Sequence, residues 1–95
     1  MARYITLLRF TEQGARSIRK STARAQAFRQ AAAKAGVRVE GQYWTAGAYD
    51  GLLIMSADDE RSILRCLAAL AVAGNVRSET LSAFDAREFA TAVGR

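Results

Sequence analysis

The sequence predicts an α+β fold in which two helices pack against a four-stranded antiparallel sheet. Apolar stretches typical of strands alternate with helical stretches in the order strand, helix, strand, strand, helix, strand. A capping signal near the end adds a short C-terminal helix. This order is the ferredoxin-like βαββαβ pattern. The chain has 95 residues, no proline and no Gly/Ser-rich linker, so one domain is expected over residues 1–95.

The first strand is predicted at residues 4–10, which are rich in β-branched, aromatic and aliphatic side chains. Residues 11–14 interrupt it. A helix follows that begins between Gln13 and Thr22 and ends at Gly36, because glycine is a common C-terminal cap. Its expected core stripe, at three-and-four spacing, consists of Ala25, Phe28, Ala32 and Ala35.

The second half of the chain repeats strand and helix signals. Residues 37–46 and 49–56 are predicted as the second and third strands. Acidic residues 58–60 place negative charge at the start of a second helix, and Gly74-Asn75 ends it. The expected apolar face of that helix consists of Ile63, Leu64, Leu67, Leu70 and Ala71.

The end of the chain predicts a fourth strand and a short helix. The strand covers residues 76–83, and Asp85-Ala86-Arg87-Glu88 matches a capping box. The helix that follows carries Phe89 and Val93. It completes the predicted set of elements.

The apolarity of the strands predicts their order in the sheet. Residues 5–8 and 52–55 are apolar on both faces, so the first and third strands are expected at the centre. The second and fourth strands are more polar, as edge strands tend to be. Two helices cover only one face, and the apolar side chains of the other face need a cover. A second copy of the sheet is the simplest cover, so a homodimer or higher homo-oligomer is expected.

Composition narrows the classes of function. Residues 1–38 hold nine Lys/Arg against one acid, a charge of +8, whereas residues 39–95 carry −3 and the chain carries +5. This asymmetry indicates an anionic partner or, more simply, a solvated arginine-rich helix facing the acidic half of a neighbour. The absence of histidine removes the commonest general base and transition-metal ligand, so no metal site and no cofactor are expected.

The single cysteine, Cys66, is expected to be a buried, inert thiol. A lone cysteine fits a reducing compartment, and the start of the chain has no secretory signal pattern, so a cytoplasmic location is predicted. No apolar run approaches the length needed to span a membrane.

Four ordered stretches carry a resemblance to a known family. They are residues 4–14, the basic helix that follows, residues 43–50 and residues 74–84, and together they cover nearly the whole chain. The third stretch reads Tyr43-Trp44-x-x-Gly47-x-Tyr49-Asp50. The chain resembles the GYD-domain family of small bacterial and archaeal proteins, named after this glycine, tyrosine and aspartate. The resemblance implies a fold of the dimeric α+β barrel type and implies little about activity.

The hairpin between the second and third strands is predicted to turn at Gly47-Ala48. Such a two-residue turn places Trp44 opposite Gly51 and Thr45 opposite Asp50. Trp44, Tyr49 and Leu53 then share one face of the sheet, and Tyr43, Asp50, Leu52 and Ile54 share the other. Asp50-Gly51 is an alternative turn that would change this pairing.

The candidate ligand-binding residues of the hairpin are Trp44, Gly47, Tyr49 and Asp50. In a functional interpretation, Trp44 and Tyr49 stack on a planar ligand while Asp50 receives a proton or orients a water. In a structural interpretation, Trp44 covers Gly51, Tyr49 packs into the dimer and Asp50 bonds to turn amides. The sequence favours the structural interpretation.

Two further pairs are candidates. Arg77 and Glu79 project from one face of the fourth strand and could fix a ligand carboxylate and a proton, although an ion contact within or between subunits is the simpler role. Thr11 and Gly14 lie where exposed helix amides could hold an anion, although helix capping is the simpler role.

These features predict a homo-oligomeric small-molecule-binding or assembly module, in which the two sheets of a dimer enclose an apolar cavity near Trp44, Tyr49 and Asp50 for a small apolar or aromatic ligand. One alternative is a cofactor-independent enzyme of the dimeric α+β barrel type, by analogy of fold. A second is binding of nucleic acid or an acidic partner through the basic first helix. Nucleic acid is not expected, because the third strand has an acid and aliphatic residues where RNA-recognition domains present aromatic ones.

Overall fold

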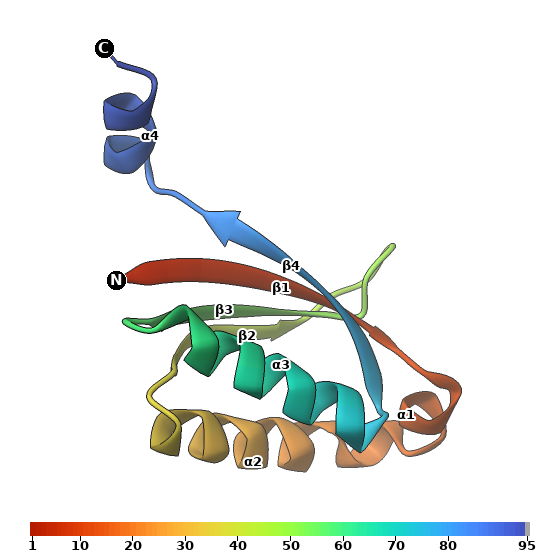
Figure 1. Ribbon diagram of the computed structural model, residues 1–95. Coiled ribbons are helices and arrows are strands. Elements are labelled where there is room, and N and C mark those ends of the chain that lie inside the picture. Colours follow the sequence, from red (N-terminus) through yellow and green to blue (C-terminus); the bar gives the residue numbers. More distant parts are fainter. Residues whose placement is uncertain (95) are drawn as a thin grey trace.

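The computed structural model describes residues 1–94 and contains one antiparallel sheet of four strands (Figure 1). The strand order is β2-β3-β1-β4, which confirms the ferredoxin-like fold with the predicted central and edge strands. The strands are β1 (Ala2–Phe10), β2 (Arg38–Trp44), β3 (Gly51–Ala57) and β4 (Val76–Ala83). The bounds of β4 agree with the prediction, and the ends of the other strands differ from it by at most two residues.

The helices are α1 (Glu12–Arg16), α2 (Ser21–Lys34), α3 (Glu60–Ala73) and α4 (Ala86–Ala92), with a 3₁₀ turn at Ile18–Lys20 between α1 and α2. Helices α2 and α3 lie on one side of the sheet, whereas α4 projects beyond the end of β4 on the other side (Figure 1). None of the helices in the described part of the chain is long and apolar enough to cross a membrane.

The helix predicted to begin between Gln13 and Thr22 and to end at Gly36 is confirmed as α2, but a short separate helix, α1, precedes it because the chain bends at Ser17. Ser17 adopts φ −112° and ψ 35°, outside the helical region. Its carbonyl accepts bonds from the Lys20 amide at 2.9 Å and the Arg24 guanidinium at 3.0 Å. These bonds replace the backbone hydrogen bonds of a continuous helix. Gly36, at φ +86°, follows the end of α2 as predicted, since glycine adopts the left-handed conformation without strain.

The hydrophobic core lies between the sheet and helices α2 and α3. Its most buried side chains on β3 are Leu53 and Met55, which lie opposite Thr6 and Tyr4 of β1. The predicted stripe of α2 is confirmed, since Ala32 is buried and the other three members are half-buried. Helix α2 is therefore held by a narrow, alanine-rich face.

The predicted apolar face of α3 was only partly right. Ile63 is buried, and Leu67 and Leu70 pack against the core, but Leu64 is 64% exposed and Ala71 is exposed. At 100° per residue, Leu64 and Ala71 lie at the edge of the stripe centred on Ile63 and Leu70.

The sheet face opposite the helices, called here the open sheet face, is apolar at its centre. The register of the ladders places Ile5 of β1 between Ile54 of β3 and Leu81 of β4, and Leu7 beside Leu52. Helices α2 and α3 cover only the other face (Figure 1). Leu81 is 49% exposed. The expected uncovered apolar face is therefore present in this chain.

Candidate functional site

The hairpin between β2 and β3 has the predicted register but a wider loop. Trp44 lies opposite Gly51, and the Thr45 amide donates to the Asp50 carbonyl at 3.0 Å. The two-residue turn was wrong, because the strands end at Trp44 and Gly51 and residues 45–50 form the loop. The Thr45 hydroxyl donates to the Tyr49 carbonyl at 2.6 Å. In a two-residue turn, that carbonyl would instead accept a backbone amide of the facing strand. Gly51 belongs to β3, which excludes the alternative turn at Asp50-Gly51.

Trp44 lies on the helix side of the sheet. Its indole Nε1 donates to the Ser21 hydroxyl at the start of α2, at 2.9 Å. A side chain at Gly51 would approach the Tyr43 carbonyl oxygen to 3.2 Å, so the glycine permits close pairing next to the indole. Trp44 is nevertheless 48% exposed, which leaves part of its ring available.

Tyr49 lies on the open sheet face, so the prediction that Trp44 and Tyr49 share a face was wrong. Its hydroxyl donates to Glu79 Oε1 at 2.8 Å, and the Arg9 guanidinium lies 4.5 Å from the ring centroid. Arg9 Nε also donates to the Ala48 carbonyl at 3.0 Å. Because Tyr49 belongs to the loop rather than to the ladder, strand alternation does not fix its direction.

The surroundings of Tyr49 keep it protonated. The hydrogen bond to Glu79, together with burial and the negative charge of Glu79, raises the pKa of Tyr49 above its ordinary value of 10.0, while Arg9 acts in the opposite direction. Tyr49 is therefore a neutral hydrogen-bond donor near neutral pH and is poorly suited to act as a general base.

Asp50 fastens the hairpin to the end of β1. Its Oδ2 accepts from the Phe10 amide at 2.8 Å, and its own amide donates to the Leu8 carbonyl at 2.8 Å. The structural interpretation placed this carboxylate on turn amides, whereas its partner is an amide of the neighbouring strand. The second oxygen, Oδ1, is in none of the hydrogen bonds found among residues 1–94, and the residue lines the cavity described below.

Arg77 and Glu79 share the open sheet face, as predicted. The register places Arg77 opposite Arg9 and Glu79 opposite Leu7. Glu79 accepts the Tyr49 hydroxyl, and the ion pairs found among the described residues include neither Arg77 nor Glu79. Two like charges, Arg9 and Arg77, thus lie next to each other at one end of this face.

Thr11 and Gly14 lie in a joint between α1 and the loop that precedes β4. The Thr11 hydroxyl donates to the Gly74 carbonyl at 2.6 Å and accepts from the Gly14 amide at 3.1 Å. Gly14 is buried, and any side chain there would collide with the Asn75 carbonyl. This geometry favours capping and close packing, and anion binding at these amides stays a prediction.

A cavity of about 370 Å³ lies between the sheet, helix α2 and the C-terminal half of α3. Trp44 and Asp50 line it, but Tyr49 does not. It also lies under the helices rather than between two sheets. Most of its wall is apolar, and the main contributors are Leu8, Phe10, Phe28, Trp44, Leu53 and Leu70.

Groups suited to metal or nucleophilic chemistry are few in residues 1–94. No three acidic or cysteine side chains of this part gather in a way that could hold a metal ion. Cys66 is buried in the core, and burial raises the pKa of its thiol.

Comparison with known proteins assigns the family. The sequence pattern of the GYD domain matches residues 4–93. The chain belongs to the GYD domain family. The three residues that give the family its name, Gly47, Tyr49 and Asp50, all lie in the loop that ties β3 to β1 and β4 in this GYD domain.

Two relatives extend the comparison. A protein of Thermus thermophilus is 33% identical over 84 residues, which cover 87% of this chain and 88% of the relative. Its name is glutamine synthetase and cystathionine beta-lyase binding protein. The crystal structure of TTHA0845, also from Thermus thermophilus, is similar in fold, with a TM-score of 0.57 and 26% identity, over 90% of this chain and 96% of that one.

Sequence reasoning missed two arginines of this GYD domain. Arg9 holds the Tyr49 ring and the hairpin loop, and Arg24 lines the cavity. Both belong to the basic first third of the chain, where the pattern indicated solvated charge. For Arg9, the alternation of β1 could have predicted a position on the same face as Leu7. No sequence pattern predicted the position of Arg24.

Proposed function

We propose that this GYD domain is a homo-oligomeric protein-binding module that associates through its open sheet face. The observation that carries the proposal is an apolar sheet centre that no helix of the described residues covers. Apolar side chains of three strands meet there, and such a surface is unfavourable in water. They are Ile5, Leu7, Leu52, Ile54 and Leu81.

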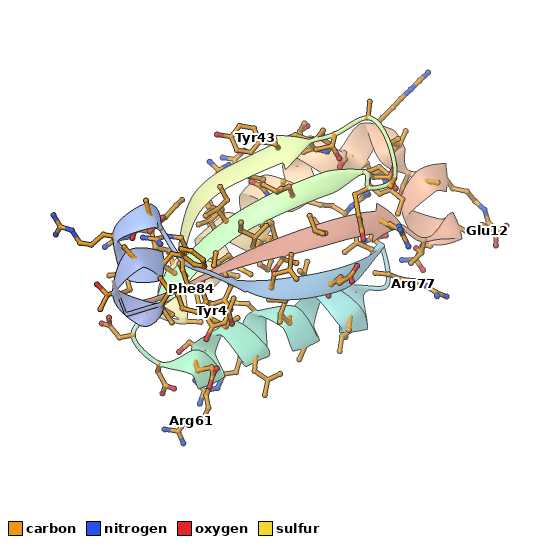
Figure 2. All side chains as sticks on the ribbon, turned by 90° about the horizontal axis from the view of Figure 1, so that it is seen from above. Tyr4, Glu12, Tyr43, Arg61, Arg77 and Phe84 are labelled. Carbon is orange, nitrogen blue, oxygen red and sulfur yellow. The ribbon has the colours of Figure 1, made fainter. Side chains whose placement is uncertain are left out.

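The edge of this face supports the same proposal. Arg9, Arg77 and Glu79 lie at one end, and Arg3 pairs with Glu88 of α4 at 3.2 Å at the other. Viewed from the open side, Arg77 and Phe84 lie toward opposite ends of β4 (Figure 2). An apolar centre with a charged rim is the ordinary anatomy of a protein interface.

Helix α4 adds a second apolar surface on the same side. It projects from the sheet. The side chains of Phe89 within it and of Phe84 and Val93 beside it are all exposed. Its capping box is complete, with Asp85 and Glu88 each accepting the other's amide at 2.7–2.8 Å. A well-capped helix with uncovered aromatic residues fits an arm that packs on a second copy.

The relative from Thermus thermophilus supports protein binding as the activity. Its name describes a protein that binds two enzymes. We extend the class of activity, binding to other proteins, to this chain. A dimer formed through the open sheet face would still expose helices α2 and α3, including the basic residues of α2, for such partners.

Catalysis and nucleic-acid binding fit the site less well. Asp50 and Tyr49, which would carry an acid–base reaction, each hold a structural hydrogen bond. Several basic side chains of the first helical region are likewise engaged: Arg16 pairs with Glu12 at 3.0 Å, and Arg29 donates to Gln42 at 2.7 Å. These contacts favour a binding module over either alternative.

Sedimentation velocity at micromolar concentration tests the proposal with matched variants. The native chain is expected to sediment as a dimer or larger species. Leu81→Lys, on the open sheet face, should weaken association by about tenfold or more, because it buries a charge in the apolar centre. Leu64→Lys, at an exposed site of α3, should leave it unchanged. A native chain that stays monomeric, or two variants that behave alike, would contradict the proposed interface.

A second measurement tests the binding of other proteins. Surface-immobilised GYD domain is exposed to purified glutamine synthetase and cystathionine beta-lyase from the same source organism. Saturable binding of either enzyme, with the unrelated protein ovalbumin as a control, supports the proposed activity. Binding of neither enzyme would limit the proposal to self-association.

A further inference from the structure

Arg24 of α2 has a guanidinium group that the protein only half satisfies. Its Nη1 donates to the carbonyl and to the hydroxyl of Ser17, both at 3.0 Å. Its Nη2 is buried and has no hydrogen-bond partner among residues 1–94. No acidic side chain of that part forms an ion pair with it. A buried donor on a charged group is costly to leave unpaired, so this atom needs an acceptor.

The unpaired donor belongs to a residue that lines the cavity under α2. Most of the other polar side chains of the wall have partners within the protein, but the Tyr43 hydroxyl and Asp50 Oδ1 are in none of the hydrogen bonds found among residues 1–94. Ser21 accepts from Trp44, Gln42 accepts from Arg29, and Asp50 accepts from the Phe10 amide. The rest of the wall is mainly aliphatic and aromatic. The cavity therefore combines a mainly apolar wall with one cationic side chain, Arg24, and one acidic side chain, Asp50.

We propose that this cavity binds a small carboxylate with an apolar body. On binding, the Arg24 side chain turns so that Nη2, which is buried in the free protein, donates to one carboxylate oxygen, and the body lies against Phe28 and Trp44. A single guanidinium matches a monoanion, since the described residues that line the cavity include no second cationic side chain for a doubly charged headgroup. The volume of about 370 Å³ is within the range of small-molecule sites.

The charge distribution of the chain favours the approach of such a ligand. Residues 1–38, which include α2, carry a charge of +8. Clefts beside charge of one sign raise the local concentration of oppositely charged ligands. The site lies on the helix side of the sheet, opposite the open sheet face, so it is distinct from the proposed protein interface.

Two carboxylates and their neutral amides test the proposal on the native chain. Decanoate represents an aliphatic body and phenylbutyrate an aromatic one, with decanamide and phenylbutyramide as neutral counterparts. Titration calorimetry and the emission of Trp44, the sole tryptophan, report binding. At least one carboxylate should bind about tenfold or more tightly than its amide, because the charge-assisted bond to Arg24 is lost in the amide. The carboxylate that binds identifies the kind of body.

Variants locate the effect. Arg24→Gln should abolish the preference for the carboxylate, whereas Arg19→Gln, which removes the same charge from an exposed site, should keep it. Ala25→Leu, which fills the cavity, should weaken both ligands. Equal binding of carboxylate and amide by the native chain, or binding of neither, overturns the proposal. That comparison does not depend on whether Arg24→Gln folds.

Discussion

At the scale of single residues, the hairpin loop is held by side chains that reach neighbouring strands. Asp50 accepts from a backbone amide of β1, and the Tyr49 hydroxyl donates to a carboxylate of β4. Arg9 of β1 donates to a carbonyl of the loop. The sequence predicted that these residues matter and predicted the pairing of Trp44 with Gly51. It could not predict the direction of Tyr49, because direction in a loop depends on partners that are distant in the chain.

Removal of the Asp50 carboxylate should destabilise the fold. In Asp50→Ala the Phe10 amide loses its acceptor at the end of a central strand. The expected loss is about 1–3 kcal/mol in the free energy of unfolding, as for other unsatisfied buried donors. Urea denaturation at fixed protein concentration measures it. Asp58→Ala, at an exposed position, is the control and should change stability little. Equal stability of the two variants would mean that the bond is not formed.

The Tyr49–Glu79 bond should give stability a component that is lost in alkali. The folded pKa of Tyr49 is raised above 10.0, so folding binds the phenol proton more tightly. Its contribution is therefore complete below pH 10.0 and is lost as pH rises through the raised pKa. The stability difference between the native chain and Tyr49→Phe should shrink over that range.

The difference in tyrosinate absorbance between the native chain and Tyr49→Phe isolates this ionisation. Tyr4 also has a raised pKa, through burial and its bond to Glu60, but it is present in both proteins. A difference spectrum that titrates below pH 10.0 would refute the assigned bond.

At the scale of elements, the strands were more predictable than the helices. Alternation and apolarity placed β1 and β3 at the centre of the sheet. The break between α1 and α2 escaped prediction, because it depends on bonds from Ser17 to Arg24 and on the joint of Thr11 with Gly74. Local sequence has helix formers on both sides of the break, and only the folded chain brings these partners together.

The joint between α1 and the start of β4 should tolerate no side chain at Gly14. In Gly14→Ala the new methyl group meets the Asn75 carbonyl, so α1 must move away. We expect a loss of about 2 kcal/mol or more in the free energy of unfolding, typical of overpacking against backbone. Ala15→Gly, its neighbour, is the control and should lose only about 1 kcal/mol through helix propensity. Thermal and urea unfolding compare the two variants. An unchanged free energy of unfolding in Gly14→Ala would show that α1 moves away from the Asn75 carbonyl without cost.

At the scale of the whole molecule, the sheet separates two surfaces of different chemistry. The open sheet face is apolar with a charged rim, and the cavity on the helix side holds one unsatisfied arginine. The sequence predicted an uncovered face and a cavity near Trp44, but it placed the cavity between two sheets. The position of the cavity depends on how far α2 lies from the sheet. Helix α2 is held by a narrow alanine stripe, and no sequence pattern specifies its distance from the sheet.

This separation predicts that the two binding activities can be removed independently. Leu81→Lys should lose self-association and keep the preference for a carboxylate over its amide. Arg24→Gln should keep self-association and lose that preference. The reason is that each substitution alters a side chain on its own side of the sheet and leaves the ladder bonds between strands in place. Sedimentation velocity and titration calorimetry on the same two proteins measure both properties. If Leu81→Lys also lost the carboxylate preference, the cavity would depend on the assembled oligomer, and the two surfaces would have to be treated as one coupled site.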